Sequence, residues 1–307
     1  DIMWLILAFI SAFLLGFYDV FKKMSLKNNP VIPVLFLNTV FCSVIFLPLI
    51  IISSHTTWLD GTLFHVASGG FAEHKWIILK SVIVLSSWIC GYVAMKNLPI
   101  TIVGPINATR PVMVLVGAML VFGESLNAWQ WAGVLLAVLS FFLLSRSGKK
   151  EGIIFTHNRW IVFLVLAAIL GAISGLYDKF LMASKANGGV GLDKMMVQSW
   201  FNIYQSVLMG VILMLMWWHN CRQSTPFHWR WSILGISVFI CLADFAYFFS
   251  LSHDDAMISM VSMIRRGSVV VSFLFGAMIF RERNLRSKAI DMLLVLFGML
   301  CIWIGSY

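Results

Sequence analysis

Long apolar segments separated by short polar stretches recur along the whole chain. Within a segment the apolar residues are continuous, as in Val112–Phe122 and Leu135–Leu144, and do not alternate with polar residues as in a membrane β-strand. A bilayer core about 30 Å thick is crossed by about 20 residues of α-helix. Ten segments reach about this length: Ile2–Phe21, Pro33–Ser53, Trp76–Met95, Ile100–Phe122, Ala128–Ser145, Trp160–Met182, Lys194–Trp218, Trp231–Leu251, Ala256–Phe280 and Ser287–Ser306. The pattern therefore predicts an all-α integral membrane protein with ten transmembrane helices.

The composition agrees with this class. Of 307 residues, 60% are hydrophobic and 11% are charged, whereas an average soluble domain has about 25% charged residues. This composition excludes a soluble enzyme, a nucleic-acid-binding module and a disordered chain, because too little polar surface is available to face water. The net charge of +9 then indicates basic loops on one side of a membrane.

Two halves of the chain repeat short motifs in the same order. The matching pairs are Gly16–Phe21 with Gly175–Phe180, Asn38 with Asn202, Tyr92 with Tyr247, Asn107 with Ser262, and Arg110 with Arg265. Each half holds five predicted spans, so the halves enter the membrane from opposite sides. Residues 1–150 and 151–307 are thus predicted to form two inverted five-helix repeats, an arrangement typical of secondary transporters with a site between the halves.

The repeated motifs resemble a known family. The first half carries Tyr92-x-Ala94-Met95-Lys96-x-Leu98-Pro99, Gly104-Pro105, Arg110-Pro111, Gly123-Glu124-x-Leu126 and Gly133, and the second carries Tyr247 through Leu251, Arg265-Arg266, Glu282 and Leu285. This pattern resembles the repeat unit of the drug/metabolite transporter superfamily, and specifically its EamA-like members. The resemblance implies a central cavity lined mainly by spans three, four, eight and nine, with contributions from spans one, two, six and seven. It also implies that spans five and ten pack at the periphery.

The second half departs from this pattern. It has His253-Asp254-Asp255 around the position of Leu98-Pro99 in the first half, and Arg266 at the position of Pro111. The two halves therefore need not have equal roles.

Three arginines near the middle of predicted spans are the strongest functional signal. Arg110 lies in the fourth span, and Arg265 and Arg266 lie in the ninth. A charged side chain at this depth is costly, so each is a candidate substrate-binding residue. Guanidinium groups bind carboxylate or phosphate, and the plastid sugar-phosphate exchangers resemble this chain in Tyr247, Arg265 and Arg266. The alternative is a structural arginine bonded to backbone carbonyls or a buried aspartate.

Other polar and aromatic residues within the spans are also candidates for substrate contact. They are Asn107, Ser262, Tyr92, Tyr247, Trp88, Asn38 and Asn202. Aromatic side chains also fill helix interfaces, so core packing remains an alternative for each ring.

Acidic residues and the tyrosines beside them are candidates for gating or coupling: Asp19, Asp178, Asp244, Tyr18 and Tyr177. Asp19 also fits a salt bridge to Lys22 or Lys23 on its own helix. Asp178 fits a contact across the halves. Asp244 could neutralise an arginine or carry a proton.

These observations predict a secondary transporter for a small organic metabolite that bears a carboxylate or phosphate. The alternatives are an exporter of amino acids or amphiphilic drugs with structural arginines, and a membrane sensor or scaffold without transport. No catalytic motif, cofactor motif or metal-ligand spacing is present in the sequence. The expected partners are the lipid bilayer and a small-molecule substrate but no nucleic acid, and we expect a monomer, with a dimer as the alternative.

The expected location is the bacterial inner membrane. The loops after odd-numbered spans carry most of the Lys and Arg residues, which predicts cytoplasmic odd loops and both termini outside. The bacterial exporters that the chain resembles are described with cytoplasmic termini, so both orientations stay open.

Overall fold

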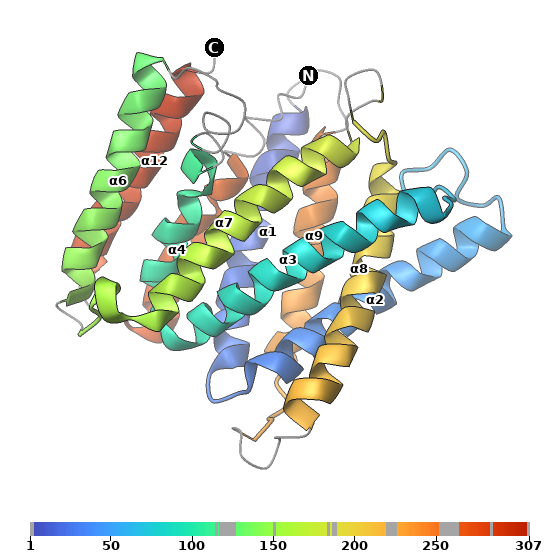
Figure 1. The fold of residues 1–307 in the computed structure, drawn as a ribbon, viewed down its shortest axis with the longest axis horizontal. Helices are drawn as coiled ribbons and strands as arrows, with labels where there is room; N and C mark the ends of the chain where they lie inside the picture. The colour runs from blue at the N-terminus through green and yellow to red at the C-terminus, as the bar shows by residue number, and fades with distance from the viewer. Residues whose placement is uncertain are drawn as a thin grey trace.

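The protein is a bundle of helices in which helices from the two halves of the chain pack side by side (Figure 1). The computed structural model describes residues 3–113, 116, 127–149, 152–182, 185, 189–218, 226–251, 264–282 and 285–305. The helices are α1 (Met3–Leu26), α2 (Val31–His55), α3 (Phe71–Asn97), α4 (Ile100–Ala108), α6 (Ala128–Lys149), α7 (Arg159–Met182), α8 (Lys194–Ile212), α9 (Trp231–Leu251), α11 (Ser268–Phe280) and α12 (Leu285–Gly305), with a short turn η1 (Phe155–His157) and a π-helical turn η3 (Leu213–Trp218). No strand occurs in these ranges.

Eight helices in the described ranges are long and apolar enough to cross a membrane: α1, α2, α3, α6, α7, α8 continued into η3, α9 and α12. The all-helical class is thus confirmed. Helices α4 and α11 have 9 and 13 residues and cover only part of the predicted fourth and ninth spans. Ten spans in two inverted repeats therefore stay a prediction.

Each helix of the first half packs most extensively against a helix of the second half. The pairs are α1 with α9, α2 with α8, α3 with α7, α4 with α11, and α6 with α12. In Figure 1 the α6–α12 pair lies at one edge of the bundle, as the family resemblance implied for spans five and ten. The α2–α8 pair lies toward the opposite edge, and the other three pairs lie between these two.

Two glycines let α4 and α11 approach closely. A Cβ atom built on Gly104 would lie 2.5 Å from Cγ2 of Val269, and one on Gly276 would lie 2.3 Å from Cγ2 of Ile100. Neither helix could carry a larger residue there without moving. This contact brings the residues that follow α4 close to those that precede α11.

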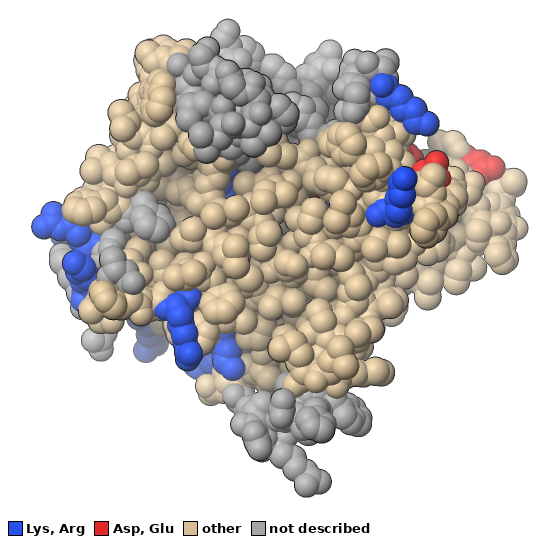
Figure 2. All heavy atoms as spheres, in the orientation of Figure 1, with Lys and Arg blue, Asp and Glu red and all other residues tan. Residues whose placement is uncertain are grey.

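The outer faces of the long helices are apolar. Their exposed side chains include Phe9, Phe13, Val44, Ile51, Leu135, Phe142, Val162, Val207, Leu242, Leu293 and Phe297. Figure 2 shows a surface with few charges, where the visible Lys and Arg lie mainly at the left and lower left, with others at the upper right. A continuous apolar surface of this kind is suited to hydrocarbon rather than water.

Candidate functional site

A cavity of about 700 Å³ lies at the centre of the bundle, between the two halves. Its described lining comes from α1, α3, α4 and the residues after it, α7, α8, α9, and α11 and the residues before it. This set matches the helices that the family resemblance implied, except that α2 contributes no lining residue among those described. Most of the ionisable residues within the predicted spans meet here.

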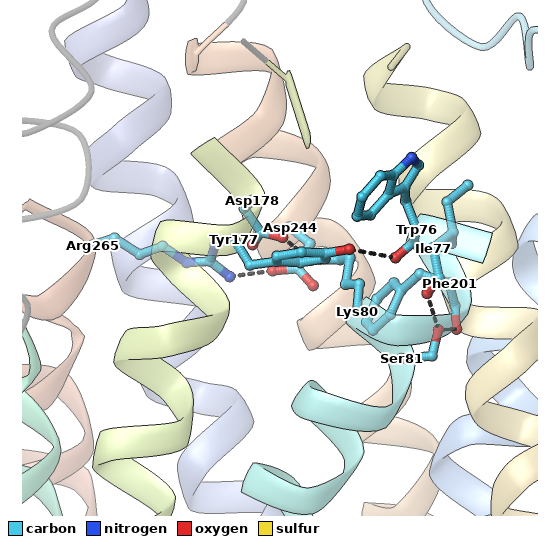
Figure 3. A network of polar contacts seen from close by, with 9 residues as sticks. All are labelled: Trp76, Ile77, Lys80, Ser81, Tyr177, Asp178, Phe201, Asp244 and Arg265. Carbon is cyan, nitrogen blue, oxygen red and sulfur yellow. Dashed lines mark hydrogen bonds and ion pairs between the residues drawn. The ribbon is translucent and has the colours of Figure 1, made fainter. Parts of the chain in front are cut away.

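Three ion pairs lie in the cavity wall. Lys22 lies 2.8 Å from Asp19 one turn earlier on α1, so the pair suggested by the sequence is present. Arg265 binds Asp244 of α9, and Lys80 of α3 binds Asp178 of α7. Figure 3 shows the last two pairs close to one another. The Lys80–Asp178 pair connects the first half of the chain with the second.

Two arginines of the cavity have no acidic partner among the described residues. Arg110 donates from Nη2 to Oδ1 of Asn107 at 3.2 Å, and its buried Nε has no partner. Arg266 makes no hydrogen bond or ion pair to any residue in the described part of the chain. The described lining carries five cationic side chains and three carboxylates, so it has an excess of two positive charges.

Helix α7 has a glycine, Gly171, where it packs against the Arg110 side chain. A Cβ atom on Gly171 would lie 2.6 Å from both Cζ and Nη1 of the Arg110 guanidinium, which is closer than van der Waals contact allows. One turn later, a Cβ atom on Gly175 would have no neighbour within 4 Å. Gly171 therefore makes room for the cation, and Gly175 faces open cavity.

The tyrosines of the cavity contact cations of the chain itself. The Cζ atom of Arg265 lies 4.2 Å from the ring centroid of Tyr247, and Nζ of Lys22 lies 4.4 Å from that of Tyr18 and 5.3 Å from that of Tyr92. Such cation–π contacts orient both groups. The rings thus hold the cations in place, in addition to forming apolar wall.

Three predicted site residues do not line the cavity. Asn38 is buried on α2, donates to Oη of Tyr92 at 3.2 Å and accepts from the Ser237 hydroxyl at 2.9 Å. Asn202 donates to the carbonyl of Gln198 on its own helix, and Tyr177 donates to the carbonyl of Trp76 (Figure 3). Asn38 therefore supports the lining residue Tyr92 through a hydrogen bond from outside the cavity.

The other predicted site residues either line the cavity or lie outside the described residues. Eleven line the cavity: Tyr18, Asp19, Trp88, Tyr92, Asn107, Arg110, Asp178, Asp244, Tyr247, Arg265 and Arg266. Ser262 lies outside the described residues.

Lys80 is a lining residue that the sequence analysis did not select. Its side chain is 4% exposed, and its Nζ lies 4.9 Å from the ring centroid of Phe201. The signal was available, because Lys80 is the fifth residue of the predicted third span and the cost of burying a charge applies to it as to the arginines.

Comparison with known proteins agrees with this picture. Residues 2–146 match the model of the EamA-like transporter family. A protein of known crystal structure shares the fold with a TM-score of 0.61 and 15% identity, over 96% of this chain and 94% of its own. None of the curated proteins matches the sequence. The first half of the chain is thus similar to the EamA-like transporter family, a family of membrane transporters.

Proposed function

We propose that the protein is a secondary transporter for a small organic anion bearing a carboxylate or phosphate, and that the anion binds in the central cavity. The observation that carries the proposal is the pair of guanidinium groups, Arg110 and Arg266, that have no carboxylate partner among the described residues. A buried cation without a counter-charge is costly, and a bound anion removes that cost. Guanidinium groups also provide paired donors that match the oxygens of carboxylate and phosphate.

Alternating access is the mechanism we propose. Exchanging the two halves converts the pair α1–α9 into the pair α7–α3, and both pairs are present. The pairs α2–α8, α4–α11 and α6–α12 each convert into themselves. A packing scheme that is unchanged by this exchange supports two halves that rock about a common site. The proposed location is the bacterial inner membrane.

The test is binding and transport with the purified protein in proteoliposomes. Candidate carboxylates and phosphate esters are screened for uptake, and the affinity for the best one is compared between wild type, Arg266→Gln and Arg110→Gln. Loss of one charge-assisted interaction is expected to weaken binding about 10- to 100-fold. Arg159→Gln is the matched control, because Arg159 is exposed at the start of α7 and stacks on Trp160 outside the cavity. Wild-type affinity in both cavity variants would contradict an anion site.

One observation favours a second candidate, an exporter of amino acids. Asp178 and Asp244 line the same cavity as the arginines, so the ammonium of a zwitterion would share these carboxylates with Lys80 and Arg265. The same screen separates the candidates, because an amino acid exporter would select zwitterions over anions of similar size.

A further inference from the structure

A second cavity, of about 580 Å³, lies at one end of the α6–α12 pair. This pair forms the edge of the bundle, and neither helix contributes a described residue to the central cavity (Figure 1). The second cavity is lined by the last two turns of α6 and the first two turns of α12. It is therefore separate from the proposed transport site.

An unpartnered carboxylate lies in the wall of this edge cavity. Asp291 of α12 is 2% exposed, and its Oδ2 is buried without a hydrogen-bond partner. The carboxylate makes no ion pair within the described ranges of the chain. Ser147 of α6 lines the same cavity, and its buried hydroxyl also lacks a partner. Buried polar groups are nearly always paired, so these two indicate a partner from outside the chain.

Basic side chains lie beside this carboxylate. Arg146 and Lys149, from the last turn of α6, line the cavity and are exposed. On α12 itself, Lys288 is fully buried one turn before Asp291 and lies 4.0 Å from Glu282. The edge cavity thus presents two accessible cations and one buried acceptor.

The wall of the cavity continues into surface that faces hydrocarbon. Ile290 lines the cavity and is 58% exposed, and Leu293 and Phe142 on the same pair of helices are also exposed. Basic residues at the end of an apolar helix pair are typical of the depth of lipid headgroups. A ligand with a polar head and an apolar tail fits both parts of this surface.

We propose that the edge cavity binds a phospholipid whose headgroup carries both a phosphate and a primary ammonium, a phosphoethanolamine lipid. Arg146 and Lys149 donate to the phosphate oxygens, and the ammonium donates to Asp291. The acyl chains lie along the apolar face next to Ile290. A phosphoglycerol lipid offers Asp291 neutral hydroxyl donors and no positive charge, and a phosphocholine lipid carries a quaternary ammonium with no N–H to donate.

The experiment measures which lipids stay bound to the purified protein. Wild type is exchanged into detergent with equal amounts of phosphoethanolamine, phosphoglycerol and phosphocholine lipids of identical chains, and bound lipid is counted by native mass spectrometry. Soluble O-phosphoethanolamine is tested in parallel, to separate a lipid site from a site for the free headgroup.

Wild type is expected to select the phosphoethanolamine lipid over the phosphocholine lipid about tenfold, as a charge-assisted hydrogen bond provides. Asp291→Asn, which keeps the shape of the side chain, is expected to abolish this selection. Arg146→Gln lowers retention of all three lipids. Arg286→Gln is the matched control with unchanged retention, because Arg286 is an exposed cation at the same end of α12 that does not line the cavity.

Three results would overturn the proposal: no lipid selection by wild type, unchanged selection by a folded Asp291→Asn variant, or binding of free O-phosphoethanolamine that lipid does not displace. None of these readouts depends on transport, so the lipid site and the proposed function are tested independently.

Discussion

At the scale of single residues, the cavity is defined by which cations have a carboxylate partner. Asp19 and Asp178 occupy equivalent positions in the repeated motif, yet Asp19 pairs within α1, whereas Asp178 pairs with Lys80 of the other half. Position in the repeat therefore does not determine the partner. Asp19 therefore forms an ion pair within one helix, whereas Asp178 forms an ion pair between the two halves of the chain.

Removing Lys80 tests this connection. Lys80→Met leaves Asp178 as an unpaired charge in a partly buried site and is expected to lower the free energy of unfolding by about 1–3 kcal/mol. Lys80→Met combined with Asp178→Leu is expected to recover most of the loss, because no lone charge remains. Thermal and denaturant unfolding in detergent measures both variants. Additive losses in the double variant would show that the pair is not coupled.

Gly171 and Gly175 provide a matched pair of variants on one helix. Gly171→Ala places a methyl group where the Arg110 guanidinium lies and is expected to weaken anion binding about tenfold, because the cation must move. Gly175→Ala adds the same methyl group to open cavity and is expected to change affinity by less than about twofold. Affinities are measured on the reconstituted protein. Equal effects of the two variants would refute a role of Gly171 in placing Arg110.

The arginines could be found from the sequence because a charge within an apolar span is conspicuous. Their partners could not. Helices α7 and α9 bring Asp178 and Asp244 to the cavity from separate parts of the chain, and pairing at this distance in sequence depends on the packing of whole helices. The position of Asn38 within its predicted span likewise could not show that its side chain binds Tyr92 and does not line the cavity.

At the scale of helices, both ends of the α3–α4 connection are held by side chains from elsewhere. Lys23 of α1 donates to the carbonyl of Met95 at 2.6 Å and also to that of Leu98, at the end of α3. Glu282 accepts from the amides of Ile100 at 2.8 Å and Thr101 at 3.1 Å, and from the Thr101 hydroxyl, at the start of α4. A cation at a helix C-terminus and an anion at an N-terminus are both favourable.

Loss of the Glu282 cap is expected to destabilise the protein. Glu282→Ala leaves two amides of α4 without an acceptor and is expected to cost about 2 kcal/mol. Glu73→Ala is the control, because Glu73 caps the start of α3 with an exposed hydrogen bond to the Gly70 amide at 2.8 Å, and its loss is expected to cost about 0.5 kcal/mol. Unfolding midpoints in detergent compare the two. An equal loss of stability in both variants would mean that the contact of Glu282 with α4 stabilises the protein no more than an exposed helix cap does.

Helix positions were predicted well where apolar runs have clear polar ends. The predicted span Trp160–Met182 agrees with α7 to within one residue at its start. The prediction of helix faces was harder, because α2 and α9 are apolar around their whole circumference, so periodicity cannot show which side meets the cavity.

At the scale of the whole molecule, the cavity exists because helices of one half pair with those of the other. Five such pairs make up the bundle, and the surface beyond them is apolar with few basic residues, most of them at the left and lower left of Figure 2. An uneven distribution of Lys and Arg sets the orientation of a membrane protein. The orientation of the protein in the bilayer can therefore be tested by labelling its loops.

Single cysteines test the predicted orientation. The ten-span topology with cytoplasmic odd loops places residue 60, between α2 and α3, outside and residue 158, before α7, in the cytoplasm. Asp60→Cys is therefore expected to react with a membrane-impermeant thiol reagent in intact cells, and Asn158→Cys only after permeabilisation. Cys42, Cys90, Cys241 and Cys301 are buried, so Cys221→Ser provides the background. The opposite labelling pattern would reverse the orientation, and labelling of both sites from one side would contradict the number of spans.

The contact between Gly171 and Arg110 also constrains how the sequence can diverge. The two residues lie 61 positions apart, yet a side chain at 171 would displace the flexible end of the Arg110 side chain from its present position. Among relatives of this chain, a residue other than glycine at 171 should occur together with the loss of arginine at 110. Homologues that lack both would then be read as members that have exchanged this substrate class for another.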